Sequence, residues 1–314
     1  MLYPIDESIL NVYYLKYALE TIEFGQQKSS VPNINANMIK SLSIPVPPLP
    51  VQEEIVRILD NFSLLSAELE AELEGRRKQY DFYRTLLLDF SEGKKQAYEG
   101  QSDPRNLLLS FDANADSGSV QWKALGDIAT FKYGYTDKAK DKGAARYIRI
   151  TDIDENGCLL PNNAKYIDIT EDSKPYLLSS GDIVVARTGA TFGKTLYYGL
   201  DEQAIYASFL IKIELNDSVL SRYYWHFSKS KYYWEQANKY VSKAGQQQFN
   251  SNAICKIEIP IPSLAEQQRI VDILDRFDTL TNDLSQGLPA EIEARKKQYE
   301  HYRDKLLTFK RKGE

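Results

Sequence analysis

The chain of 314 residues is 43% hydrophobic and 26% charged, which is typical of an ordinary globular protein of about two domains. No apolar run approaches the roughly 20 residues that cross a bilayer, and the start of the chain lacks the basic and apolar regions of a secretion signal, so we expect a cytoplasmic protein without a membrane partner. The formal net charge of −5 argues against a protein that coats nucleic acid indiscriminately, although a local basic face is still compatible with it.

An internal repeat dictates the architecture, because residues 6–90 return as residues 216–309. The proline-rich segment 44–49 (IPVPPL) corresponds to 259–264 (IPIPSL), and the match continues into the following segment, with four extra residues in the second copy. Upstream, the repeat pairs the Tyr-Tyr doublet at 13–14 with the doublet at 223–224.

Each copy ends in a segment with the apolar spacing of a long amphipathic helix. From Ile55 to Leu69, apolar residues follow one another at alternating steps of three and four, as in a coiled-coil seam. We therefore predict antiparallel coiled-coil spacer helices at 51–90 and 263–310, with a plain helical hairpin as the alternative.

The second helix carries signals for its start and for an interruption. Ser263 and Glu266 form a capping box after a proline, which predicts that the helix begins there. Pro289 has no amide hydrogen to donate, so we expect a kink or a break near it.

Short strand-like segments between the two helices predict an α+β domain at 120–262. Expected strands are 145–153, 182–187, 195–198 and 208–214, followed by one helix at 218–239, with a polar linker at 91–119 before the domain. Residues 1–50 match only the last part of this domain, so we interpret them as the C-terminal remnant of a first domain and expect the chain to be N-terminally truncated.

Three motifs in this order carry a resemblance to a known family. The segment 178–194 (LSSGDIVVARTGATFGK), the exit 259–264 and the helix opening 266–271 (EQQRIV) resemble the specificity subunit of type I restriction-modification systems. The resemblance implies target-recognition domains that each read half of a split DNA site, held apart by two helices that dock the modification subunits.

The resemblance also implies a non-catalytic subunit of a restriction endonuclease and DNA methyltransferase complex. Its expected partners are double-stranded DNA, modification (methyltransferase) subunits, a restriction subunit and a second copy through the helices. This chain is expected to bind no cofactor, since S-adenosylmethionine, ATP and Mg belong to the partner subunits.

Charge and side-chain chemistry locate candidate DNA contacts within 120–262. This region holds 18 Lys and Arg against 16 Asp and Glu, so its net charge is +2. Phosphates attract cations, and base edges are read by Arg, Lys, Gln and Asn. The candidates fall in three segments, for each of which an ordinary solvated or structural turn is the alternative: Lys132, Tyr133 and Tyr135; Arg187, Thr188, Thr191 and Lys194; Lys243, Gln246, Gln247, Gln248 and Asn250.

The sequence gives less support for nucleotide binding, catalysis or metal binding. The segment 189–195 (GATFGKT) is one residue short of a phosphate-binding P-loop, so we predict a glycine-rich hairpin instead. Cys158 and Cys255 are isolated and are expected to be buried thiols, and the two histidines are too distant to build a catalytic or metal site.

Together these features predict a sequence-specific DNA recognition subunit that acts as a ruler. Helices of about 40 residues, or roughly 60 Å, would set the distance between two recognition elements. The alternative functions are a coiled-coil interaction scaffold without a DNA role, and an inactive remnant or silent cassette of a specificity gene.

Overall fold

The structure is a computed structural model that describes residues 4–22, 39, 42–90, 120–242 and 247–309. The chain divides into two compact units, one made of residues 1–76 and 279–314 and the other of residues 77–278. Helix α3 (Leu49–Leu87) and helix α9 (Leu264–Asn282) contribute residues to both units. The predicted linker 91–119 lies outside the described residues.

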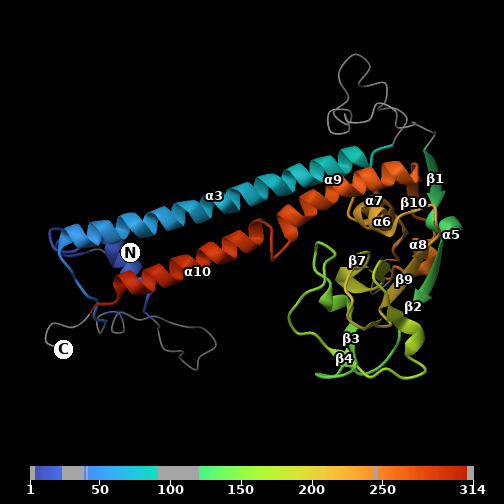
Figure 1. Ribbon diagram of the computed structural model, residues 1–314, viewed down its shortest axis with the longest axis horizontal. Helices are drawn as coiled ribbons and strands as arrows, with labels where there is room; N and C mark the ends of the chain where they lie inside the picture. Colours follow the sequence, from blue (N-terminus) through green and yellow to red (C-terminus); the bar gives the residue numbers. More distant parts are fainter. Residues whose placement is uncertain (1–3, 23–38, 40–41, 91–119, 243–246, 310–314) are drawn as a thin grey trace, which may run out of the picture. The chain divides into compact units, whose positions relative to one another are not determined.

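The first unit contains α1 (Val12–Glu20), the N-terminal part of α3 and α10 (Leu288–Leu307) (Figure 1). Its core joins residues of all three helices, namely Tyr14, Tyr17, Ala18, Ile55, Val56, Leu59 and Leu307. The rings of Phe62 and Tyr302 stack at 5.4 Å between α3 and α10, so these helices pack along their apolar stripes as the periodicity predicts.

The second spacer helix begins and breaks where its sequence signals lie. The Glu266 amide donates to Ser263 Oγ at 3.3 Å just before α9. Helix α9 ends at Asn282, and α10 starts at Leu288 with Pro289 in its first turn, so the interruption is a complete break rather than a kink.

The second unit is built on short sheets and belongs to the α+β class. An antiparallel sheet has the order β2-β9-β6-β7, and a mixed sheet has the order β4-β3-β8-β5, in which β3 and β8 are parallel. A two-stranded sheet pairs β1 with β10. The strands are β1 (Gln121–Ala124), β2 (Ala129–Tyr133), β3 (Ala145–Ile148), β4 (Tyr166–Ile167), β5 (Leu177–Leu178), β6 (Asp182–Ala186), β7 (Thr195–Tyr198), β8 (Ala204–Tyr206), β9 (Leu210–Leu215) and β10 (Glu258–Ile261).

Strand β6 separates two cores by the alternation of its side chains. Ile183 and Val185 face the larger core with α6 (Ser221–Ser228), α7 (Lys231–Tyr240) and α8 (Ser251–Ile254), whereas Val184 and Ala186 face a second cluster. Short α5 (Leu125–Ile128) also joins the larger core.

Three expectations for this unit differ in detail from the structure. The single helix expected at 218–239 is two helices, because the Ser230 hydroxyl accepts the Tyr233 amide at 3.3 Å and caps a new start. The strand expected at 145–153 ends at Ile148, where the chain enters a 3₁₀ turn. Cys158 and Cys255 are half-buried, not buried.

In the described part of the chain, no helix is both long and apolar enough to span a membrane. The same residues contain no group of three or more His, Cys, Asp or Glu side chains that could hold a metal ion.

Candidate nucleic-acid interface

Two of the three candidate segments meet at one end of the antiparallel sheet. Tyr133 ends β2, and Arg187 directly follows β6, while both strands run antiparallel to β9 between them. Their ends therefore lie beside Phe209, the residue before β9, whose carbonyl accepts the Arg187 amide at 3.0 Å. Tyr133, Arg187 and Phe209 continue the face of the sheet that covers the larger core.

The third segment joins this sheet end as a short additional strand. The Phe249 amide donates to the Arg187 carbonyl at 2.7 Å, and the Gly189 amide donates to the Gln247 carbonyl at 3.1 Å. Gln248 forms a β-bridge with Thr188 between these two bonds. The backbone of 247–249 is thus fixed against 187–189, and the half-buried Gln248 and Gln247 lie opposite Thr188 and Gly189, the two residues that follow Arg187.

The Arg187 guanidinium contacts two aromatic rings. Its Cζ lies 5.2 Å from the centroid of the Tyr133 ring and 5.5 Å from that of Phe209, and its Nε donates to the Ser208 carbonyl at 2.9 Å. Tyr133 is 40% exposed and Phe209 is 51% exposed, although both are large and apolar. The Tyr133 hydroxyl is placed by Ser251, whose amide donates to it at 3.2 Å.

We define the recognition surface as six partly exposed side chains at this sheet end, which are supplied by β2, by the residues next to β6 and β9, and by the segment 247–251. Sequence analysis missed two of its members, Phe209 and Ser251. The signal for Phe209 was available, because alternation along the expected strand 208–214 places it on the same face as Ile211 and Ile213. The members are Tyr133, Arg187, Phe209, Gln247, Gln248 and Ser251.

The structure separates Lys132 and Tyr135 from the recognition surface. Lys132 points to the opposite side of β2 from Tyr133, where its Nζ donates to the Pro175 carbonyl at 2.7 Å and lies 4.7 Å from the centroid of the Tyr176 ring. The Tyr135 ring packs on that same Tyr176 ring at 5.3 Å.

Two other candidate side chains are engaged inside the protein. Thr188 is only 2% exposed, so its side chain is withdrawn from contact with a ligand, contrary to the expectation. The Asn250 carboxamide accepts the Ala253 amide at 3.0 Å and caps α8. Lys243 and Gln246 lie outside the described residues.

The glycine-rich segment between β6 and β7 forms a tight turn rather than a phosphate cradle. The amides of Phe192, Gly193 and Lys194 donate to carbonyls within the hairpin, so they do not converge on an external anion. The Thr191 hydroxyl donates to the Thr188 carbonyl at 3.1 Å. The half-buried Lys194 precedes β7 and completes the cationic side chains at this sheet end.

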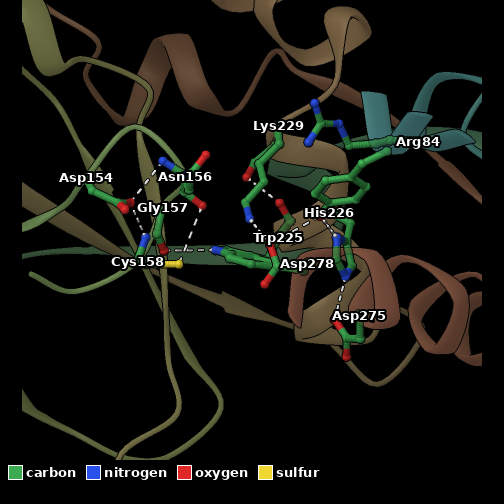
Figure 2. Close-up of polar contacts among 12 residues, drawn as sticks. Arg84, Asp154, Asn156, Gly157, Cys158, Trp225, His226, Lys229, Asp275 and Asp278 are labelled. Carbon is green, nitrogen blue, oxygen red and sulfur yellow. Dashed lines mark hydrogen bonds and ion pairs between the residues drawn. The ribbon is translucent and has the colours of Figure 1, made fainter. Parts of the chain in front are cut away.

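In the second unit, a partly buried polar network lies where α6 meets α3 and α9 (Figure 2). His226 Nε2 lies 2.7 Å from an oxygen of Asp275, which also accepts Arg222 Nε at 2.8 Å. Tyr80 contributes its hydroxyl at 3.2 Å from His226 Nδ1. Because His226 is fully buried, desolvation lowers its pKa to about 4.

Lys229 forms the second part of this network. Its Nζ lies 3.2 Å from Asp278 and 3.0 Å from the centroid of the Trp225 ring. Burial lowers the Lys229 pKa to about 8. Arg222 and Lys229 contribute to the net positive charge of 120–262, but both cations are held by α9 carboxylates.

The network continues into a loop of the recognition domain. Trp225 Nε1 donates to the Gly157 carbonyl at 3.3 Å, and Figure 2 shows the loop around Asp154 lying beside this contact. Gly157 has φ +71°, and a Cβ there would lie 2.3 Å from the Thr195 carbonyl oxygen, so only glycine fits. The loop is therefore fixed to α6.

The internal repeat recurs as equivalent contacts within each unit. The Tyr14 hydroxyl donates to the Pro45 carbonyl at 2.9 Å, and the Tyr223 hydroxyl donates to the Pro260 carbonyl at 2.9 Å. Tyr14 thus corresponds to Tyr223, and the pairing of Tyr14 with Tyr224 inferred from sequence was wrong by one residue.

The same shifted register relates a second pair of contacts. Tyr17 donates its hydroxyl to Asp60 at 2.5 Å in the first unit, and His226 contacts Asp275 in the second. The first unit therefore contains the counterpart of α6 and its contact with a spacer helix, with a neutral phenol in place of the imidazole.

Comparisons with known proteins agree on one family. The family model described as "Type I restriction modification DNA specificity domain" matches residues 4–75 and 119–294. The chain is 32% identical to the Escherichia coli type I restriction enzyme EcoR124I/EcoR124II specificity subunit, over 98% of this chain and 74% of that protein. It is 33% identical to a putative type I restriction enzyme specificity subunit of Haemophilus influenzae, over 96% of this chain and 73% of that protein.

The chain belongs to the type I restriction-modification specificity family. A solved structure of a type I restriction-modification S subunit from M. genitalium has the same fold, with a TM-score of 0.59 and 17% identity over 98% of this chain and 75% of that one. The recognition surface of this specificity subunit lies entirely within the matched residues 119–294.

Proposed function

We propose that this specificity subunit reads one half of a split double-stranded DNA site through its recognition surface. The observation that carries the proposal is Arg187, a cation that contacts two exposed aromatic rings and pairs through its backbone with the segment that carries Gln247 and Gln248. Arginine and glutamine are the side chains that pair with purine edges in the major groove, and exposed aromatic carbons suit contact with thymine methyl groups.

The spacer helices are proposed to dock the subunits that carry out the chemistry. The relatives are specificity subunits of restriction enzymes, and a similar solved structure concerns complex assembly of a type I system. We therefore assign methylation and cleavage to modification and restriction subunits, which bind S-adenosylmethionine, ATP and Mg. No catalytic step is assigned to this chain. The complex is proposed to act in the cytoplasm. Residues 1–50 are assigned to the end of another recognition domain because their contacts repeat those of α6.

Removing a phosphate-binding cation at the sheet end tests the proposal. Lys194→Ala is expected to weaken binding of the complex with its modification subunit to genomic DNA fragments severalfold, and to lower the slope of log K against log salt by about 1. Filter binding across a salt series measures both quantities. Lys174→Ala, an exposed lysine that pairs with Glu171 and lies on neither the spacer helices nor the recognition surface, is the control and should change neither. Equal effects of the two variants would count against a DNA interface at this sheet end.

Shortening the spacers tests whether they act as a ruler. Helix α3 has 39 residues, which corresponds to roughly 58 Å at 1.5 Å per residue. Deleting seven residues from α3 together with seven from α10 preserves the apolar stripes and removes about 10 Å. The permitted gap between half-sites, mapped from methylated DNA, is expected to shrink by about three base pairs at 3.4 Å each. An unchanged gap would contradict the ruler.

A further inference from the structure

We propose that Arg187 reads a guanine base, as a bidentate donor to its O6 and N7 atoms. This inference rests on the proposed DNA-reading function and adds the identity of one base. It concerns a single residue, whose backbone and guanidinium are both restrained by contacts within the protein.

The backbone of Arg187 is held from two sides. Its amide donates to the Phe209 carbonyl at 3.0 Å, and its carbonyl accepts the Phe249 amide at 2.7 Å. The residue therefore sits at the junction of β9 and the added strand 247–249, and cannot shift without breaking pairing on either side.

The guanidinium is restrained by three contacts. Its Cζ lies 5.2 and 5.5 Å from the ring centroids of Tyr133 and Phe209, and its Nε donates to the Ser208 carbonyl. That bond uses the inner donor, and the two terminal nitrogens form the rigid fork of a planar guanidinium. Little side-chain entropy remains to be lost when the fork meets a ligand.

A rigid, restrained fork suits a base better than a phosphate. Guanine is the base that presents two adjacent acceptors in the major groove, and they lie in the plane of the base pair. A phosphate tetrahedron accepts a cation from many directions and needs no planar fork.

The first test compares Arg187→Lys and Arg187→Ala with the wild type, each co-expressed with the modification subunit, by mapping methylated sites. Lysine keeps the charge but not the fork. We expect a G·C pair at one fixed position of the wild-type motif, and a preference there that falls about 5- to 150-fold in Arg187→Lys, as the loss of a bidentate contact predicts. An Arg187→Lys protein with the wild-type motif and methylation level would overturn the inference in favour of a phosphate contact.

The second test holds even if the variants methylate no DNA. The wild-type complex is bound to duplexes in which 7-deazaguanine replaces each guanine of the half-site in turn, which removes only the N7 acceptor. One position should weaken wild-type binding about tenfold and leave the residual binding of Arg187→Ala unchanged. Equal losses in both proteins, or none at any position, would overturn the inference.

These outcomes separate the inference from the function on which it rests. A wild-type complex that methylates no defined motif would refute both. A wild type with a defined motif, whose Arg187 variants behave as the wild type does, would refute only the assignment of guanine. Thermal unfolding of Arg187→Lys, which retains a cation beside the rings, should match the wild type and exclude a folding defect.

Discussion

Replacing Asp278 with alanine is expected to lower the free energy of unfolding of the second unit by about 3–5 kcal/mol. The carboxylate and its partner Lys229 have side chains only 12% and 11% exposed, so the substitution leaves a buried ammonium without its counter-charge. Urea denaturation followed by tryptophan fluorescence reports on this unit specifically, because all three tryptophans lie within residues 77–278.

Two further variants isolate the buried charge as the cause. Asp272→Ala removes an exposed carboxylate of the same helix, whose partner is Gln268, and should change the free energy by less than about 0.5 kcal/mol. Adding Lys229→Met to Asp278→Ala removes the unpaired cation and should recover more than half of the loss. If Asp278→Ala lowered the free energy of unfolding no more than Asp272→Ala does, the network would not stabilise the second unit.

Acidification is expected to destabilise the second unit through His226. Burial lowers its pKa to about 4 from an ordinary value of 6.5, so the unfolded state binds the additional proton between these pH values. The contribution of His226 to the free energy of unfolding is therefore present above pH 6.5 and is lost as the pH falls toward 4. The expected loss is about 2 kcal/mol between pH 7 and pH 5.

His226→Gln should remove this pH dependence, whatever its effect at pH 7, because glutamine can still donate to Asp275 but does not titrate. His301→Gln is the matched control, since His301 is exposed, and it should retain the wild-type slope. Urea midpoints at pH 7, 6 and 5 measure the slope. A slope that persists in His226→Gln would mean that other groups dominate the acid response.

The features that sequence analysis predicted correctly are those encoded by neighbouring residues. Ser263 and Pro289 mark the ends and the break of the spacer helices by local backbone chemistry, and the apolar period specifies their packing faces. Strands β6 and β7 were equally evident, because they are rich in β-branched and aromatic residues and are joined by a glycine-rich turn.

The features that it missed join residues far apart in the chain. The pairing of 247–249 with 187–189, which merges two candidate segments into one surface, has no local signal. A charge count also cannot distinguish an exposed lysine from Lys229, which is buried against Asp278. Lys132 and Tyr133 are adjacent candidates, yet they point to opposite sides of a strand that local pattern did not reveal.

The most direct measurement is to co-express the chain with the modification subunit of its own genome and to map methylated bases in the host DNA by long-read sequencing. The account predicts a defined methylated motif that changes when residues 120–262 are exchanged for those of a relative while the helices are kept. A complex that assembles stably but methylates no defined motif would contradict the account, because it would show a protein that assembles without reading DNA.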